Sequence, residues 1–148
     1  MKSPFKTRVS WHSLLLSASI ALGACSAFQN DENLYVALGG ENAIAVIVEN
    51  FILEIARDER IIDHFEVSNV QRFRVMMNQH LCMVADGPCE YTGDTMIDTH
   101  TGMGVTEGDF NAIVENMMAA MDKAEVPLGP QNRLLARLAT FRGEIIYR

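Results

Sequence analysis

The sequence is short of cysteine and of positive charge, and both shortages narrow what the chain can be. Only three cysteines occur in 148 residues, and none belongs to a Cys-x-x-Cys or Cys-x-x-Cys-His motif. These absences exclude a dithiol redox motif and the covalent attachment of a c-type haem. Lysine and arginine number 12 against 19 aspartates and glutamates. This balance argues against nucleic acid as a partner, because a binder needs a basic face to displace phosphate counterions.

The sequence also has no internal repeat and no long stretch in which polar and apolar residues alternate as in a strand. The pattern of its apolar residues is that of helices. Apolar residues recur at three- and four-residue steps, which predicts long helices over 41–57, 69–84, 106–123 and 131–147, with short ones near 34–38 and before His100. Hydrophobic residues make up 49% of the chain, enough for the core of one domain. We therefore predict an all-α fold.

The first 33 residues have the features of an export signal and a tether. Residues 1–24 combine a basic start with an apolar run over 14–22, as secretory signals do. The segment ends in Leu-Gly-Ala-Cys25, which resembles the bacterial lipobox, whose cysteine is lipidated and becomes the first residue of the mature chain. An ordinary cleaved signal and an uncleaved anchor are the alternatives. We expect a signal peptide over 1–24, a lipidated tether over 25–33 and a folded domain over 34–148, held on the periplasmic face of a bacterial membrane, with Ser26 favouring the outer membrane.

The two other cysteines flank a turn. Cys82 and Cys89 stand on either side of Asp86-Gly87-Pro88, and such a turn brings the two Cα atoms to about 5.5 Å, within disulfide range. An exported, oxidising location permits the bond. We predict a Cys82–Cys89 disulfide.

One histidine lies in a glycine-bounded segment, Tyr91 to Val105. Thr95 can cap a short helix in which Met96 and His100 stand four residues apart, on one face, before Gly102 and Gly104 end it. An imidazole held in this way can bind iron through one nitrogen while the other donates to a carbonyl, and neighbouring methionine and valine side chains suit a flat ring. The alternative is a histidine on an ordinary amphipathic helix.

Several motifs, taken together in order and spacing, resemble those of the group I truncated haemoglobins over residues 32–147. They are Leu34-Tyr35, Leu38-Gly39-Gly40, Val48-Glu49-Asn50-Phe51, Asp58, Phe65, Gly87-Pro88, Tyr91-Thr92-Gly93, Met96, His100, Gly102, Gly104-Val105-Thr106 and Phe110. The resemblance implies a two-on-two helical sandwich that encloses haem b (iron protoporphyrin IX). It also implies that His100 is the proximal iron ligand, that Phe65 wedges against the ring, and that further ring contacts come from Met96, Val105, Phe110 and Ile113.

The distal side of the ring is where the chain departs from this family. The resemblance assigns it to Ile52, Phe73 and Met77, whereas the family commonly carries a tyrosine at the first position and often a glutamine at one of the other two. None of the three side chains here is a strong hydrogen-bond donor. Bound dioxygen is polar and gains about 1–2 kcal/mol from a donor in a dry pocket, and nitric oxide and carbon monoxide depend on it less. We expect an apolar distal pocket, with tyrosine-dependent oxygen stabilisation in doubt.

Three nearby groups each have a structural and a functional interpretation. His80 lies one turn beyond Met77. We interpret it as a histidine on the helix surface or pocket rim whose hydrogen bonds are made, and we do not expect it to bind iron. Arg72 and Arg74 can pair with haem propionates or with solvated carboxylates. Met77 can fill the core or approach the iron to give a His/Met pair, as in electron-transfer haem proteins.

Three functions therefore remain. The first is a haem-binding globin, not an enzyme, that reversibly binds oxygen, nitric oxide or carbon monoxide at iron held by His100. The second is a His/Met or ligand-switching redox protein that acts on nitric oxide, nitrite or peroxide with an unidentified reductase. Nothing in the distal set supplies the general acid or base that such turnover uses. The third is a ligand-free helical lipoprotein that serves as a partner module, in contact with the membrane through lipid on Cys25.

Overall fold

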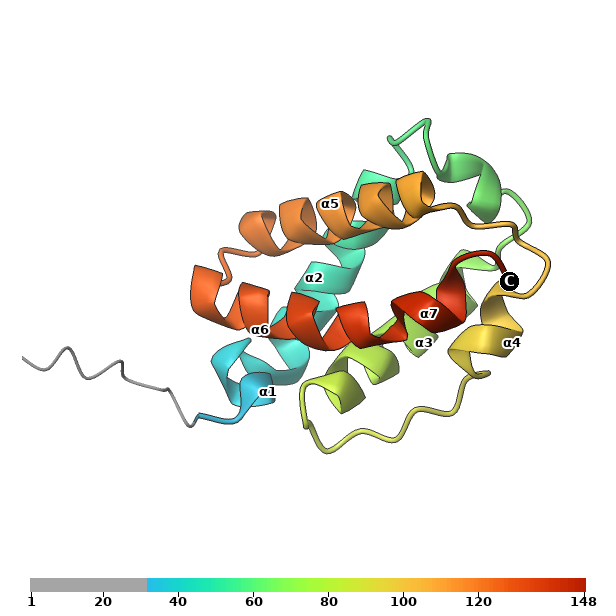
Figure 1. The fold of residues 1–148 in the computed structure, drawn as a ribbon. Coiled ribbons are helices and arrows are strands. Elements are labelled where there is room, and N and C mark those ends of the chain that lie inside the picture. Colours follow the sequence, from blue (N-terminus) through green and yellow to red (C-terminus); the bar gives the residue numbers. More distant parts are fainter. Residues whose placement is uncertain (1–31) are drawn as a thin grey trace, which may run out of the picture. The chain divides into compact units, whose positions relative to one another are not determined.

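Two long helices, α2 (Gly40–Ile55) and α5 (Glu107–Lys123), pack against each other over a larger surface than any other pair of described helices (Figure 1). The computed structural model describes residues 32–148, all of which lie in one compact unit. The predictions for the signal peptide and for lipid on Cys25 fall outside the described residues. Within 32–148 every regular element is helical, which confirms the all-α prediction. None of these helices is long and apolar enough to cross a membrane.

The helices follow the predicted order. They are α1 (Leu34–Ala37), α2 (Gly40–Ile55), the 3-10 turn η1 (Ile62–Phe65), α3 (Val70–Val84), α4 (Met96–His100), α5 (Glu107–Lys123), α6 (Leu128–Leu138), the 3-10 turn η2 (Ala139–Phe141) and α7 (Arg142–Ile145).

Side-chain caps explain where most of these helices begin. Asn69 accepts a hydrogen bond from the backbone of Arg72 at the start of α3, and Thr95 does the same for Asp98 at the start of α4. Thr106 and Asp109 form a reciprocal capping box at α5. Each cap satisfies a backbone N–H that has no partner inside the helix. The short polar residues before each apolar run therefore fix the helix starts.

The last predicted helix, 131–147, differs from what forms. It begins earlier, at Leu128, because Pro130 falls in the first turn, where a missing N–H costs nothing. It is then interrupted by η2 before α7. The Thr140 hydroxyl donates to the Arg137 carbonyl at 2.7 Å, a local bond that competes with helix hydrogen bonding and bends helices. The interruption turns Phe141 and Arg142 toward the interior of the fold, where both line the cavity described below.

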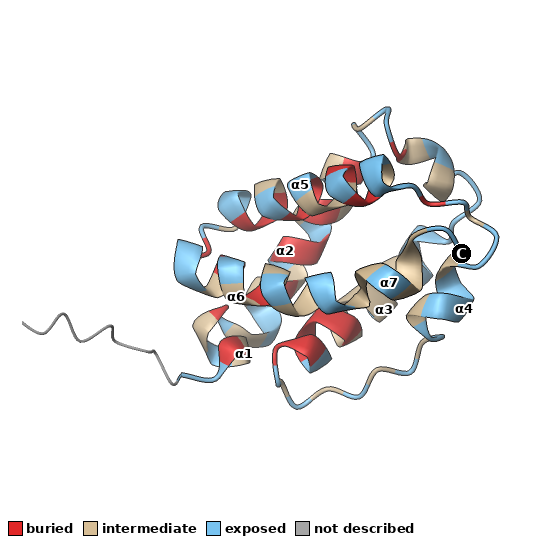
Figure 2. Cartoon of the chain, in the orientation of Figure 1, coloured by how far each residue is buried: buried red, intermediate tan, exposed pale blue. Residues whose placement is uncertain are grey.

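The packed core lies around α1, α2 and the ends of α3 and α5 (Figure 2). Its most deeply buried side chains are Leu34, Ile44, Ile47, Val48, Ile61, Leu81, Met121 and Leu134. Helix α7, in contrast, has no fully buried residue, and it packs beside α4 (Figures 1 and 2). The fold is thus densely packed around α1 and α2 and less densely packed around α7 and α4, the helix that carries His100.

Candidate functional site

His100 is held in a defined orientation at the end of α4. Its Nδ1 lies 2.7 Å from the carbonyl oxygen of Met96. A carbonyl only accepts hydrogen bonds, so Nδ1 carries the proton and Nε2 keeps its lone pair. Gly102 and Gly104 follow with φ of 82° and 64°, a left-handed backbone that suits glycine and ends the helix at once. The imidazole therefore offers one free nitrogen lone pair in a fixed direction.

This imidazole lines a cavity of about 840 Å³, within the range of roughly 300–1,000 Å³ typical of small-molecule and cofactor sites. Its walls come from η1, α3, α4, α5, α6 and the η2–α7 segment, and most of the lining side chains are apolar. Eight of the nine residues that the sequence assigned to the cofactor line it: Phe65, Phe73, Met77, Met96, His100, Val105, Phe110 and Ile113. The site therefore assembles from segments far apart in the sequence.

The wall contributed by α3 faces the cavity with aromatic and thioether groups. Phe73 packs edge-on against Phe65, with ring centroids 5.5 Å apart, and lies 6.4 Å from Phe51. Met76 and Met77 follow along the same helix and also line the cavity. None of these side chains donates a strong hydrogen bond. A ligand next to Phe73, Met76 and Met77 therefore meets carbon and sulfur, while His80 lines the cavity farther along the same helix.

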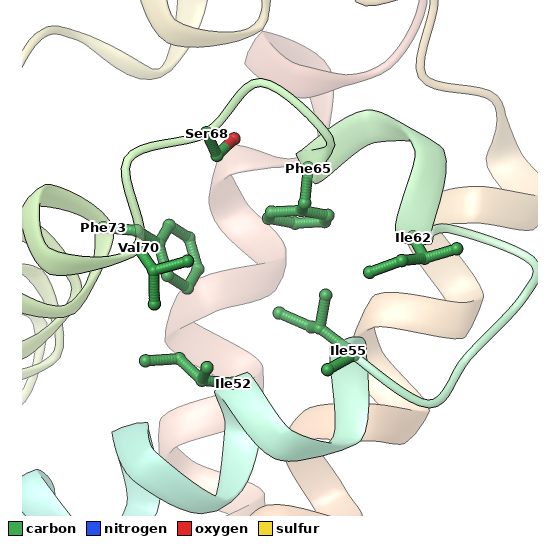
Figure 3. A pocket seen from close by; sticks show the side chains of 8 residues that line it. Ile52, Ile55, Ile62, Phe65, Ser68, Val70 and Phe73 are labelled. Atoms are coloured by element: carbon green, nitrogen blue, oxygen red, sulfur yellow. The ribbon is translucent and has the colours of Figure 1, made fainter.

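Ile52 is the one assigned residue that does not line the large cavity. Phe51 lines it instead, and Ile52 points into a smaller apolar pocket of about 110 Å³ beside it (Figure 3). Successive helical residues project in directions about 100° apart, and here that step takes the side chain from the large cavity at Phe51 to the smaller pocket at Ile52. The two pockets adjoin at Phe65 and Phe73, which line both.

His80 departs from the expectation of a satisfied rim or surface histidine. Its side chain is 6% exposed, and its Nδ1 is sealed from solvent without a hydrogen-bond partner among the described residues. The rings of Tyr91 and Phe141 cover it, each with a centroid 5.2 Å away. Burial is the larger cause that lowers the pKa of His80, and the nearby His100 imidazole lowers it further. The buried ring therefore favours its neutral form.

The two arginines considered for propionates are engaged elsewhere. Arg72 pairs with Asp94 at 3.1 Å, and Arg74 pairs with Glu49 and Gln71. Neither lines the cavity, and these contacts are those of the alternative in which both arginines pair with solvated carboxylates. The guanidinium at the cavity edge belongs to Arg142, which pairs with Glu107 at 2.8 Å and lies over Phe110. The interrupted last helix places it there, and sequence periodicity gave no sign of that interruption.

A disulfide joins the end of α3 to the segment that leads into α4. Cys82 and Cys89 are bonded, with Cα atoms 5.8 Å apart. Gly87 makes the tight turn between them, and a Cβ there would lie 2.5 Å from the Tyr35 ring. Two residues beyond the bridge on each side stand His80 and Tyr91, whose rings touch. The bridge therefore fixes two cavity-lining groups relative to each other.

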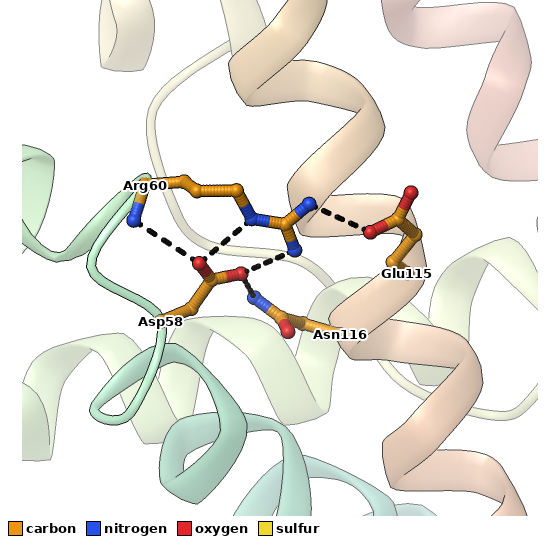
Figure 4. Close-up of polar contacts among 4 residues, drawn as sticks. All are labelled: Asp58, Arg60, Glu115 and Asn116. Carbon is orange, nitrogen blue, oxygen red and sulfur yellow. Dashed lines mark hydrogen bonds and ion pairs between the residues drawn. The ribbon is translucent and has the colours of Figure 1, made fainter.

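An ionic network next to the cavity links α5 to the turn that follows α2. Asp58 accepts hydrogen bonds from Arg60 at 2.7 Å and from Asn116 at 2.9 Å, while Arg60 reaches Glu115 at 2.8 Å (Figure 4). The side-chain hydrogen bond from Arg60 is the largest cause that holds the pKa of Asp58 well below its usual range. The network supports the loop that carries Phe65.

The residues fit a haem group: one oriented imidazole lone pair, a large apolar cavity, and aromatic and methionine side chains along its walls. Three or more metal-ligating side chains do not cluster anywhere in 32–148. Iron at this site would therefore be held by His100 and by the nitrogens of a ring that the cavity encloses.

Known proteins share this architecture. Residues 33–147 match the family model described as bacterial-like globin. The chain is 29% identical over 113 residues to a group 1 truncated haemoglobin of Mycolicibacterium paratuberculosis, covering 76% of this chain and 83% of that protein. It is 32% identical over 95 residues to one from Tetrahymena pyriformis, covering 64% of this chain and 78% of that protein.

The fold agrees with these sequence relationships. The crystal structure of the Tetrahymena pyriformis truncated haemoglobin in its Fe(III) form superposes with a TM-score of 0.77 at 27% identity, covering 79% of this chain and all of that one. The helical arrangement is thus the two-on-two globin sandwich. The chain belongs to the bacterial-like globin family, with group 1 truncated haemoglobins as its relatives.

Proposed function

We propose that this globin binds haem b with Nε2 of His100 as the iron ligand and that it binds a diatomic gas reversibly on the α3 side. The observation that carries the proposal is the His100 ring, whose Nδ1 is committed to the Met96 carbonyl beside a cavity of cofactor size. A histidine oriented by a carbonyl is the usual arrangement of an imidazole metal ligand, because the hydrogen bond fixes the tautomer and raises the basicity of the ligating nitrogen. Membership of the globin family gives independent support.

The α3 wall indicates which gases are favoured. Phe73, Met76 and Met77 offer no strong donor, so a polar ligand such as dioxygen loses the stabilisation of about 1–2 kcal/mol that a hydrogen bond gives in a dry pocket. Carbon monoxide and nitric oxide need it less. The protein should therefore retain these two gases better than oxygen, and the oxygenated form should autoxidise readily.

A second function is favoured by the two adjacent methionines. Met76 and Met77 both line the cavity from the helix across from α4, and a thioether that reached the iron would give a His/Met pair with a raised reduction potential. Such a protein would exchange electrons with a reductase and act on nitric oxide, nitrite or peroxide. Carbon monoxide separates the two functions, because a bound thioether must leave before the gas can bind.

The experiment that tests the main proposal is haem titration of the purified apoprotein. The wild-type chain should give a Soret band at one haem per chain, and His100→Ala should lose it and regain it with added imidazole. His64→Ala is the matched control, since it removes another imidazole that lines the same cavity but leaves the proposed iron ligand. A wild-type chain that takes up no haem, or a His100→Ala variant with an unchanged spectrum, would contradict the proposal.

The cellular location is part of the same proposal. The basic start, apolar run and lipobox-like Leu-Gly-Ala-Cys25 favour an exported lipoprotein held at the outer membrane, and a disulfide such as Cys82–Cys89 is typical of oxidising compartments. Membrane fractionation with mass measurement tests it. Wild-type chain should carry lipid on residue 25 in the membrane fraction, and Cys25→Ser should be released. A wild-type chain without lipid would refute it.

A further inference from the structure

Residues 89–94, here called the strap, lead from the end of α3 to α4 without regular secondary structure (Figure 1). Among the described residues, no backbone–backbone hydrogen bond involves the strap. It still contributes Tyr91 to the cavity wall and leads directly into the helix that carries His100. The position of this part of the wall therefore depends on the side-chain contacts that hold the strap in place.

Four side-chain contacts tie the strap to α3. Taken backwards along α3, they join Cys82 to Cys89, His80 to Tyr91, Gln79 to Thr92 and Arg72 to Asp94. Residue numbers fall along α3 as they rise along the strap, so the two segments lie antiparallel. The strap is thus fastened at both ends and in the middle.

The disulfide is the strongest of the four contacts. The side chains of Arg72 and Asp94 are 59% and 67% exposed, and exposed ion pairs contribute little to stability. The bond that the Thr92 hydroxyl donates to Gln79 at 3.0 Å is exposed as well, and water competes for such a bond. The ring contact stands two residues from the bridge on each segment, so it depends on the bridge for its alignment. Closure of the strap therefore depends mainly on one covalent bond.

One sulfur of this bridge can be reached from solvent. Cys82 is 3% exposed, whereas Cys89 is half-buried. A thiolate of a dithiol reductant therefore attacks Sγ of Cys89, which forms a mixed disulfide, breaks the Cys82–Cys89 bond and releases Cys82, which takes a proton. The second thiolate of the reductant then attacks its own sulfur in the mixed disulfide and releases Cys89, which also takes a proton. Two electrons and two protons pass to the protein, and the dithiol leaves as a disulfide.

We propose that the Cys82–Cys89 disulfide is a reducible latch on the haem cavity. The oxidised bridge keeps the strap closed against α3, and reduction by a dithiol opens the strap and speeds haem loss. The consequence for haem rests on the proposed function, whereas the opening of the strap concerns the chain alone. Haem retention then depends on the thiol redox state of the surroundings.

The test measures haem transfer from the loaded chain to excess apomyoglobin, before and after reduction with dithiothreitol. We expect reduction to speed haem loss on the order of tenfold, since the bridge closes a short loop with a moderate contribution to stability. Cys82→Ser/Cys89→Ser should lose haem at this faster rate with and without dithiothreitol, which shows that the reagent acts through the bridge and not on the haem. A wild-type rate that reduction leaves unchanged would overturn the latch.

Ile47→Ala controls for a general loss of stability. Ile47 is fully buried in the core and does not line the cavity, so its truncation weakens the fold without removing a contact of the strap. Haem loss from this variant, measured under conditions where it stays folded, should remain within about twofold of wild type. A rate as high as that of reduced wild-type protein would mean that the bridge acts only through overall stability, and it would overturn the inference.

Limited chymotrypsin digestion of the haem-free chain gives a readout that needs no haem. An opened strap exposes the peptide bond after Tyr91, so reduction should speed cleavage there, as identified by fragment masses, more than Ile47→Ala does. Equal cleavage of reduced and oxidised protein at Tyr91 would contradict the latch. A wild-type chain that takes up no haem, visible as a missing Soret band, would overturn the proposed function and the haem-loss claim, while the digestion result decides separately whether the strap opens.

Discussion

The packed core and the cavity wall are built from the same amino-acid types on the same helices, yet they differ in what covers them. Ile47 on α2 is fully buried against other side chains, whereas Ile113 on α5 is only partly buried and lines the cavity. Each belongs to the three- and four-residue periodicity of its own helix. Periodicity therefore identifies the inward face of a helix but does not tell whether that face meets protein or a ligand.

Truncating one isoleucine in each region should give the largest difference. Ile47→Ala should lower the free energy of unfolding by about 2–5 kcal/mol, because it removes buried apolar surface and leaves a void. Ile113→Ala should cost clearly less in haem-free protein, since its side chain borders an existing cavity. Urea unfolding of both variants without haem measures this, and equal losses would mean that the two regions are packed alike.

Removing the disulfide should have the next largest effect. The double variant Cys82→Ala/Cys89→Ala loses a cross-link that closes a short loop, which contributes about 2 kcal/mol by the chain-entropy account. The loss should appear in urea unfolding under non-reducing conditions and disappear when wild-type protein is reduced. Two free thiols in periplasmically produced wild-type protein, found by alkylation and mass measurement, would show that the bridge does not form.

A hydrogen-bond donor added to the apolar wall should change the free energy of oxygen binding by less than the two variants above change the free energy of unfolding. Ile52 faces the adjoining pocket, and the longer side chain of Ile52→Tyr can reach past the Phe65–Phe73 boundary to the cavity. A hydrogen bond of about 1–2 kcal/mol should slow oxygen dissociation at least several-fold. Ile52→Phe is the control that adds a ring without the hydroxyl. If both variants release oxygen at the wild-type rate in stopped-flow measurements, position 52 does not reach the ligand.

Removing the Asp58 carboxylate should have the smallest effect on stability, and acid pH should abolish that effect. The folded-state pKa of Asp58 lies below its ordinary value of 3.8, chiefly through the side-chain hydrogen bond from Arg60. Its stabilisation is therefore present above pH 3.8 and is lost as the pH falls through the lower folded value. The difference in unfolding free energy between wild type and Asp58→Asn should stay constant from neutral pH to about pH 5 and shrink at lower pH. A difference that grows on acidification would have the wrong sign.

Local signals in the sequence were sufficient for most helix starts. Asn69, Thr95 and Thr106 are short polar residues placed before apolar runs, and each caps its helix through its own side chain. The interruption at η2 had no such signal, because it depends on one hydroxyl of Thr140 and on what the following segment packs against. Helix boundaries set by local chemistry could be predicted from the sequence, and those set by tertiary packing could not.

The features of the candidate site likewise divide into those that local sequence predicts and those that depend on tertiary packing. The His100 helix could be predicted because its cap, its Met96 carbonyl and its terminating glycines all lie within ten residues. The burial of His80 could not, since the rings that cover it come from Tyr91 and Phe141, in two separate segments. The sequence likewise left the partner of Arg72 open, because Asp94 lies 22 residues along the chain.

The visible spectrum of the purified protein, ferric and ferrous, with and without carbon monoxide, tests the central claim most directly. Haem held by His100 beside an apolar α3 wall predicts a ferrous form with one strong axial ligand, whose spectrum shifts at once and completely on addition of carbon monoxide. Two outcomes would contradict this account: a protein with no Soret band, or a six-coordinate ferrous spectrum that carbon monoxide leaves unchanged.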